Sequence, residues 1–249
     1  MQTPLIIGHR GASAVAPENT MAAFREAIAA GADGIEFDVR LTRDGVPVVI
    51  HDSTLRRTGG WQQRVADLTW SELAQIDVGN WFNRSFAQER VPSLKELLTL
   101  FESNDLVLNL EMKSDSASEH APLAEACCTL INEHSLKERV IISCFDFAAI
   151  KVVKSIDPEI KTAALFEPSL SNLSVLSNER IINQAIAVGA SALALHHRLA
   201  RKQLAEKAKL LGWSIAVWTV DDPAWIERAR SIGVAALITN NPAAMLAHR

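Results

Sequence analysis

The sequence predicts an α/β protein built as a TIM (β/α)8 barrel, with one extra antiparallel hairpin strand and a small insertion. Apolar runs of strand length alternate with amphipathic helical stretches along almost the whole chain, which is typical of βα units and a parallel sheet. The chain has 249 residues, a common length for one such barrel. We therefore expect a single domain over residues 1–249.

Nine stretches have the length and apolar content of strands, one more than an eightfold barrel needs. They cover residues 5–9, 34–42, 47–51, 106–112, 140–144, 162–166, 192–196, 213–219 and 235–239. Helices are expected between most of them, including TMAAFREAIAAG, SLKELLTLFES, APLAEACCTLINEH and ARKQLAEKAKLLG. The first and last of these end on a glycine, a common helix terminator.

The extra strand lies in residues 34–51, where there is no room for a helix between two strands. Asp44-Gly45 is a strong signal for a two-residue hairpin turn. Counting outward from that turn places Asp38 opposite His51. Removing the antiparallel strand leaves the eight parallel strands of a TIM barrel.

Residues 52–91 interrupt the alternation with glycines, arginines and aromatic residues. One short helix is expected there, because Thr69 is followed three residues later by Glu72 in a capping-box pattern. We expect an insertion over the C-terminal mouth of the barrel. Its aromatic side chains are expected to pack it onto the barrel: Trp61, Trp70, Trp81 and Phe82.

Composition indicates a small-molecule partner. The formal net charge is −4, which gives no reason to expect a nucleic acid or insertion into a membrane. The three cysteines form no disulfide framework, and the first residues resemble neither a signal peptide nor a membrane span. A cytoplasmic location is expected, and the oligomeric state is left undecided.

Three acidic side chains should converge at the C-terminal mouth. Alternation puts Glu36 and Asp38 on one side of their strand, and likewise Glu111 and Lys113 on theirs. Crowded carboxylates repel one another, and oxygen ligands of this kind suit Mg²⁺ or Ca²⁺, with Mn²⁺ also acceptable. The alternative is that the acidic residues only form salt bridges with nearby cations.

Two histidines, His9 and His51, end strands near the same carboxylates and could act as general acid and base. Arg10 and Lys113 would suit an anion such as phosphate, although Arg10 could equally pair with Glu18. Three further histidines are expected to face solvent: His120, His134 and His248. His196 and His197 could line the mouth, but their role stays open.

Seven motifs together resemble the glycerophosphodiester phosphodiesterases, and most closely the short cytoplasmic bacterial type associated with glycerol phosphate uptake. They occur in the same order along the whole chain: HRGASAVAPENT (9–20), GIEFDVRLTRDGVPVVIHD (34–52), PSLKELL (92–98), LNLEMK (108–113), ISCFD (142–146), VWTVDD (217–222) and ITNNP (238–242).

The resemblance implies a TIM barrel with metal ligands at Glu36, Asp38 and Glu111 and an acid–base pair at His9 and His51. It implies phosphate contacts from Arg10 and Lys113, and a pocket-lining aromatic residue at Trp218. Glu18 and Asn19 match the PENT signature and are expected to orient other side chains. Asn240 stands where many relatives carry aspartate, and Trp218 where many carry tyrosine; neither is expected to touch the metal ligands or the acid–base pair.

The expected reaction is metal-dependent hydrolysis of a small glycerophosphodiester to glycerol 3-phosphate and an alcohol, through a cyclic phosphate. The preferred alcohol, the physiological ion and the histidine that first acts as base stay open. The alternatives are a lysophospholipase D or phosphoinositide phosphodiesterase, a non-catalytic barrel that binds glycerol phosphate compounds, and a metal-dependent lyase or isomerase on the same scaffold.

Overall fold

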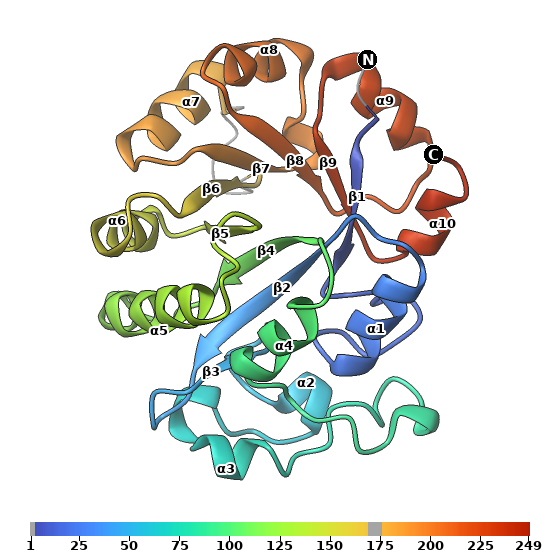
Figure 1. Ribbon diagram of the computed structural model, residues 1–249, viewed down its shortest axis with the longest axis vertical. Helices are drawn as coiled ribbons and strands as arrows, with labels where there is room; N and C mark the ends of the chain where they lie inside the picture. The colour runs from blue at the N-terminus through green and yellow to red at the C-terminus, as the bar shows by residue number, and fades with distance from the viewer. Residues whose placement is uncertain (1–2, 169–175) are drawn as a thin grey trace.

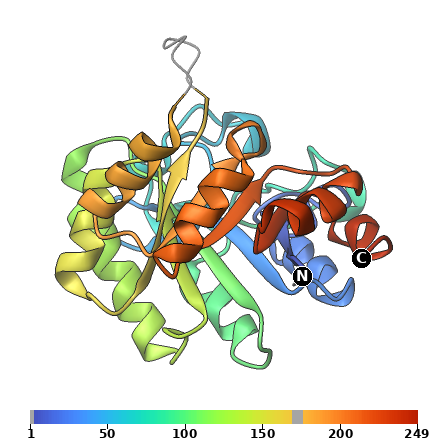
Figure 2. The same ribbon diagram turned by 90° about the horizontal axis from the view of Figure 1, so that it is seen from above.

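Eight parallel strands form a closed barrel, with a ninth strand attached to its outside. The structure is a computed structural model that describes residues 3–168 and 176–249. Figure 1 shows the strands at the centre and the helices around them, and Figure 2 shows the same arrangement from above. The strands are β1 (Leu5–His9), β2 (Gly34–Leu41), β3 (Pro47–Val49), β4 (Val107–Met112), β5 (Val140–Cys144), β6 (Lys161–Phe166), β7 (Ala192–His196), β8 (Ser214–Trp218) and β9 (Ala236–Thr239).

The barrel closes because β1 pairs in parallel with both β2 and β9. The strand order is β1-β9-β8-β7-β6-β5-β4-β2, and β3 runs antiparallel on the far side of β2. The predicted TIM barrel with one extra antiparallel strand is confirmed. All nine predicted strands are present: three have the predicted ends, and the ends of the other six differ by at most two residues.

Helices follow most of the parallel strands, as predicted. The longer ones are α1 (Met21–Ala29), α4 (Leu94–Phe101), α5 (His120–Glu133), α6 (Phe147–Ile156), α7 (Asn178–Ala187), α8 (Lys202–Leu210) and α9 (Ala224–Ile232), and the short α10 (Pro242–Leu246) ends the chain. The Thr20 side chain caps α1, and Ser93 and Glu96 form a capping box on α4. These caps satisfy amide groups that have no partner inside the helix. None of the described helices is long and apolar enough to cross a membrane.

The predicted register of the β2–β3 hairpin is wrong by one residue. Val39 pairs with Val49, so Asp38 lies opposite Ile50, whose amide donates to the Asp38 carbonyl. The loop has three residues rather than two, and Gly45 takes a positive φ of 79°. Thr42 O accepts from the Gly45 amide and Thr42 N donates to Val46 O, as in a turn followed by a bulge. His51 therefore lies beyond the end of β3, not within it.

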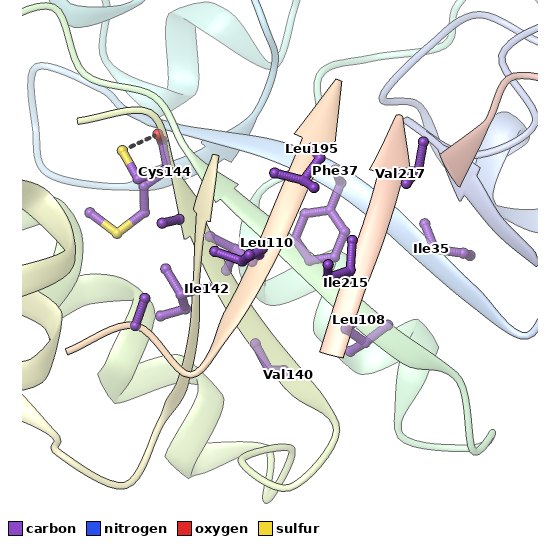
Figure 3. Close-up of a cluster of buried hydrophobic side chains, with 14 of the residues drawn as sticks. Ile35, Phe37, Leu108, Leu110, Val140, Ile142, Cys144, Leu195, Ile215 and Val217 are labelled. Atoms are coloured by element: carbon purple, nitrogen blue, oxygen red, sulfur yellow. Dashed lines mark hydrogen bonds between the residues drawn. The ribbon is translucent and has the colours of Figure 1, made fainter. Parts of the chain in front are cut away.

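The main core lies between the barrel and the helices. In Figure 3, side chains such as Phe37, Leu110 and Ile142 point outward from their strands, and all three are fully buried. Burial of apolar surface at about 25 cal/mol per Å² makes this layer the main source of stability. The alternate side chains of the same strands point into the barrel, where they form the site described below.

Residues 52–91 contain four short helical segments: α2 (Arg56–Gly59), η1 (Val65–Asp67), α3 (Trp70–Leu73) and η2 (Arg84–Phe86). The predicted capping box of Thr69 and Glu72 is confirmed. A second apolar cluster, which includes Val48, Leu55 and Leu73, joins this segment to β3. Trp70 packs against that cluster. Trp61 and Trp81 are about half exposed, so the expectation that these two side chains pack the insertion onto the barrel is wrong.

Candidate active site

A cavity of about 310 Å³ opens at the C-terminal ends of the strands. This is the end at which TIM-barrel enzymes place their active sites. Most of its lining comes from the inward-facing ends of the strands and the residues just after them: His9, Arg10, Glu36, His51, Asn109, Glu111, Lys113, Phe145, Leu165, Glu167, Trp218, Thr219 and Ile238.

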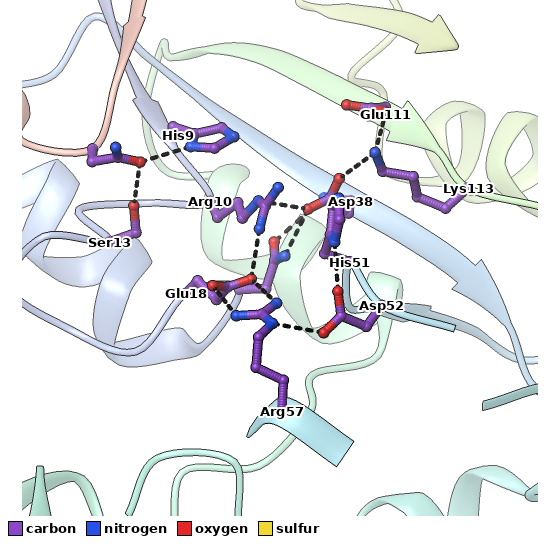
Figure 4. A network of polar contacts seen from close by, with 12 residues as sticks. His9, Arg10, Ser13, Glu18, Asp38, His51, Asp52, Arg57, Glu111 and Lys113 are labelled. Carbon is purple, nitrogen blue, oxygen red and sulfur yellow. Dashed lines mark hydrogen bonds and ion pairs between the residues drawn. The ribbon is translucent and has the colours of Figure 1, made fainter. Parts of the chain in front are cut away.

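The three predicted carboxylates meet beside this cavity. Register places Asp38 of β2 next to Glu111 of β4, and Glu36 lies two residues earlier on the same face of β2. One oxygen atom from each residue lies within 4.8 Å of the others, and all three residues are buried. Figure 4 shows Asp38 and Glu111 on either side of Lys113.

Burial and mutual repulsion shift the pKa values of these carboxyl groups apart. Burial, followed by the charges of Asp38 and Glu111, raises the pKa of Glu36 well above its ordinary value. Burial and the charge of Asp38 raise the pKa of Glu111 to about 7. Burial opposes ionisation of Asp38 too, but Arg10 and Lys113 lower its pKa to about 2. Without further positive charge, the three groups are therefore not all ionised near neutral pH.

Arg10 lies against two of these carboxylates. Its amide donates to Glu36 Oε2 at 3.0 Å, and its Nε atom lies 3.1 Å from Asp38 Oδ2. Its Nη1 donates to Glu18 Oε1 at 2.7 Å, which is the pairing that the sequence left open as an alternative to phosphate contact. The residue takes a positive φ of 55°, which is unfavourable for arginine and is often found at functional sites.

Glu18 and Asn19 hold the neighbouring groups in place. Asn19 Nδ2 donates to Asp38 Oδ2 at 2.8 Å, and Glu18 also accepts two hydrogen bonds from Arg57 of the insertion. Both residues therefore contact neighbours of the cavity, and the orienting role expected from the PENT motif stays a prediction. Arg57 was not singled out in the sequence, because nothing in the chain around it shows that it lies beside Glu18.

Lys113 follows β4 and pairs with two of the carboxylates. Its Nζ atom lies 3.4 Å from Asp38 Oδ1 and forms an ion pair with Glu111 Oε1. The ammonium group also lies 5.6 Å from the centre of the Phe145 ring. Lys113 is thus mostly buried at the cavity wall, where its charge is weakly screened.

His9 ends β1 and contacts both an amide and a carboxylate. Its Nδ1 lies 2.7 Å from Asn240 Oδ1, and its Nε2 lies 3.9 Å from Glu36 Oε2. Burial and the charge of Arg10 lower the pKa of His9. The expectation that Asn240 touches neither the metal ligands nor the acid–base pair is wrong, because Asn240 is hydrogen-bonded to one of the two histidines.

His51 reaches the cavity from the loop after β3, despite the changed register. Its Nδ1 lies 2.8 Å from Asp52 Oδ1, and Arg57 Nε donates to the other oxygen of that carboxylate. Burial lowers the pKa of His51, with further contributions from Arg10 and Lys113, whereas Asp38 and Asp52 oppose the shift. The two histidines therefore lie in one cavity with unlike partners, an amide for His9 and a carboxylate for His51.

Trp218 lines the side of the cavity away from the carboxylates. Its ring packs edge-on against Phe145, with centroids 5.6 Å apart, and edge-on against His196. Its Nε1 is buried and has no hydrogen-bond partner among the described residues, and the same is true of Asn109 Oδ1. Asn109, Phe145 and Glu167 also line the cavity but were not predicted, although alternation along β4 and β6 could have identified Asn109 and Glu167.

Two of the histidines expected to face solvent do not. His120 is buried, with Nε2 3.3 Å from Asp146 Oδ2, and His134 Nδ1 lies 2.6 Å from Glu102 Oε1. Their acidic partners lie 26 and 32 residues away in sequence, which is why helical spacing did not reveal them. His196 and His197 do not line the cavity.

Residues 9–244 match the model of the glycerophosphoryl diester phosphodiesterase family. A glycerophosphodiester phosphodiesterase of Caldanaerobacter subterraneus subsp. tengcongensis is 36% identical over 244 residues, which is 97% of this chain and 96% of that relative. The chain belongs to this family. The predicted family and its enzyme class, the phosphoric diester hydrolases, are confirmed.

Solved structures of the family agree with this assignment. A phosphodiesterase of Oleispira antarctica, solved in complex with the product sn-glycerol-3-phosphate, superposes with a TM-score of 0.88 and 26% identity over 99% of this chain and 96% of that one. A glycerophosphodiester phosphodiesterase of Agrobacterium tumefaciens superposes with a TM-score of 0.82 and 27% identity over 98% of this chain and 99% of that one.

Proposed function

We propose that this protein hydrolyses small glycerophosphodiesters to glycerol 3-phosphate and a free alcohol, using a divalent cation and the histidine pair His9 and His51. One observation carries the proposal. A single cavity brings together three buried carboxylates, two histidines and two cationic side chains, Arg10 and Lys113. This is the set of groups that cleavage of a phosphodiester by a metal and an acid–base pair requires.

The residues present fit a divalent cation. Glu36, Asp38 and Glu111 offer oxygen ligands at mutual distances suitable for one ion, and oxygen-rich sites accept Mg²⁺, Ca²⁺ or Mn²⁺. The raised pKa values of Glu36 and Glu111 also support this, because an added cation would allow all three groups to ionise. When bound, the ion would supply Lewis-acid polarisation of the phosphoryl group.

The side chains of the cavity would then perform two proton transfers in each of two steps. One histidine removes the proton from the 2-hydroxyl of the glycerol unit, whose oxygen forms the new bond to phosphorus. The other histidine gives a proton to the alcohol oxygen as its bond to phosphorus breaks. The cyclic phosphate is opened by water with the roles of the two histidines reversed, which restores their starting states.

Arg10 and Lys113 would bind the phosphoryl oxygens on which negative charge accumulates. Both keep their charge, because the surrounding carboxylates raise their pKa values in spite of burial. Fixed cations in a cavity from which water is largely excluded stabilise a transition state more than they would in bulk water. Trp218 Nε1 and Asn109 Oδ1 offer one donor and one acceptor to the glycerol hydroxyls.

The proposal is tested by measuring release of glycerol 3-phosphate from glycerophosphoethanolamine and glycerophosphocholine by the purified protein. We expect no turnover with a chelator and recovery with Mg²⁺, Ca²⁺ or Mn²⁺. Full activity in chelator would overturn the metal role. Absence of turnover with every ion would overturn the proposed substrate, and lysophospholipids and simple glycerol phosphate binding would then be measured.

A further inference from the structure

We propose that Asn240 and Asp221 are positioning residues that fix the ring orientation and the tautomer of His9. The catalytic role of His9 rests on the proposed function, but the hydrogen bonds around its ring do not depend on that proposal. A short chain of hydrogen bonds runs from Asp221 through the Asn240 side chain to the His9 ring. All three residues belong to the described part of the chain.

Barrel closure brings this chain of residues together. Gly8 of β1 pairs with Thr239 of β9, so the residues that follow, His9 and Asn240, lie side by side at the mouth. His9 Nδ1 and Asn240 Oδ1 are 2.7 Å apart, and Asn240 Nδ2 donates to Asp221 Oδ2, also at 2.7 Å. Asp221 lies in the loop after β8, which neighbours β9 in the sheet.

The Asp221 carboxylate is itself fixed by two further donors. Its Oδ1 accepts from the Asn240 amide at 2.7 Å and from Thr239 Oγ1 at 2.8 Å. With both oxygens occupied by β9 and the residue after it, Asp221 cannot move without breaking several hydrogen bonds. It therefore presents a stationary acceptor to the Asn240 side chain.

The acceptor at Asp221 decides which way the Asn240 amide points. A carboxylate accepts hydrogen bonds and donates none, so the NH₂ group of Asn240 must face Asp221. The carbonyl oxygen then faces His9, and Ser13 Oγ donates to the same oxygen at 3.0 Å. The orientation of the Asn240 amide therefore follows from its hydrogen-bond partners.

The amide orientation in turn decides the tautomer of His9. Asn240 Oδ1 can only accept, so His9 Nδ1 must carry the proton and Nε2 keeps its lone pair. Nε2 is the ring atom nearest the carboxylates of the cavity, 3.9 Å from Glu36 Oε2. A neutral ring held in this way meets an incoming hydroxyl with a free lone pair, which suits the proton acceptor of the first step.

His51 differs in the one feature that matters here. Its Nδ1 faces the Asp52 carboxylate, whose oxygens accept hydrogen bonds and donate none. Asn240 is neutral, so it orients the His9 ring through a hydrogen bond without placing a negative charge beside it. The tautomer of His9 therefore depends on an amide that can turn over, whereas the partner of His51 can only accept.

Asp221→Asn is the variant that tests the chain of hydrogen bonds. The new side chain keeps the shape of aspartate and one acceptor for Thr239 and the Asn240 amide, but it presents NH₂ where Asn240 needs an acceptor. The Asn240 side chain is then expected to turn over, so that its NH₂ faces His9. His9 Nδ1 would become an acceptor and the proton would move to Nε2.

Nitrogen-15 NMR of histidine-labelled, metal-free protein measures this directly, at a pH of about 8 where the rings are neutral. The His9 signals are identified by their loss in His9→Gln. We expect the Nδ1–H form in the natural protein and a shift towards the Nε2–H form in Asp221→Asn. Its kcat should fall on the order of 10- to 10³-fold with little change in KM, because binding groups are untouched.

The double variant that combines Asn240→Asp with Asp221→Asn provides the rescue. The new carboxylate at position 240 would accept from both His9 and the new amide at position 221, so the Nδ1–H form and most of the lost kcat should return. Asp222→Asn is the matched control, since the Asp222 side chain accepts from the Ala224 amide instead of contacting Asn240. It should match the natural protein in both measurements.

Two results would overturn the proposal. One is a natural protein whose His9 carries its proton on Nε2, a measurement that needs no variant. The other is a folded Asp221→Asn variant that keeps the Nδ1–H form. If the natural protein cleaves no glycerophosphodiester, the proposed function fails, whereas the tautomer measurement still decides the positioning role.

Discussion

The two ends of the barrel interior are built from the same strands but have opposite character. At the N-terminal end most of the inward side chains are small or apolar, including Leu5, Ile7 and Val107, around a cavity of about 100 Å³. At the C-terminal end, the next inward-facing positions of the same strands are His9 on β1 and Glu111 on β4, which line the cavity of about 310 Å³. Along one strand, the inward-facing residues therefore change from apolar packing residues to candidate catalytic residues within four positions.

This difference shows how the barrel supports so many buried charges. Buried ionisable groups cost several kcal/mol each unless they are paired and hydrogen-bonded. The apolar end and the outer core stabilise the strands, so the C-terminal end can hold carboxylates, cations and histidines in fixed positions. We expect changes at one end to alter stability and changes at the other to alter turnover.

The largest effect is expected at the mouth. His9→Ala or His51→Ala should lower kcat on the order of 10² to 10⁴-fold, because each removes a proposed acid or base. Steady-state release of glycerol 3-phosphate measures this. His134→Ala, on the outside of the barrel, is the control and should retain turnover. Near-normal kcat in either mouth variant would contradict the assigned roles.

At the opposite end, Ile7→Ala should lower the free energy of unfolding by about 2–4 kcal/mol, since it enlarges an existing cavity. Its kcat in the folded state should change little. Urea unfolding and kinetics on the same sample separate the two effects. A large loss of kcat with unchanged stability would show that the two ends are not independent.

The pH dependence of stability in chelator should report the crowded carboxylates. The pKa of Glu111 in the folded protein is about 7 against an ordinary value of 4.5, and that of Glu36 is raised as well. Between pH 4.5 and about 7 the folded protein therefore binds more protons than the unfolded chain. The stabilisation from protonated Glu111 is present at low pH and is lost as pH rises through about 7.

In chelator, the free energy of unfolding measured with urea should fall as pH rises towards about 7. Glu111→Gln should make this dependence on pH flatter. Adding Mg²⁺ should reverse the trend, because metal binding becomes tighter as protons leave the carboxyl groups. A flat profile for the natural protein in chelator would mean that the carboxylates are already ionised together.

The smallest effect is expected from filling the cavity at the N-terminal end. Ala163→Val adds two methyl groups beside this cavity, and β-branched residues suit strands. Stability should rise by about 0.5–1.5 kcal/mol, measured as a higher urea midpoint with unchanged kcat. A decrease would indicate that the cavity walls cannot accept the added volume.

The nine strands, the barrel and the strand faces that carry Glu36, Asp38 and Glu111 could be predicted from the order of residues. These features depend on alternation and on the order of elements, which are local properties of the chain. The PENT motif also identified Glu18 and Asn19 as neighbours of the site. The single-domain assignment and the roles of the site residues remain predictions.

Contacts between distant segments could not be predicted in this way. The register of the β2–β3 hairpin depends on the conformation of the loop that contains Gly45. The apolar residues near Asp44 do not distinguish between two pairing registers that differ by one residue. Asn240 meets His9 across 231 residues because β9 closes the barrel against β1. His120 meets Asp146 of the next βα unit in the same way, through packing of segments that are distant in sequence. Such contacts are fixed by packing and not by spacing along the chain.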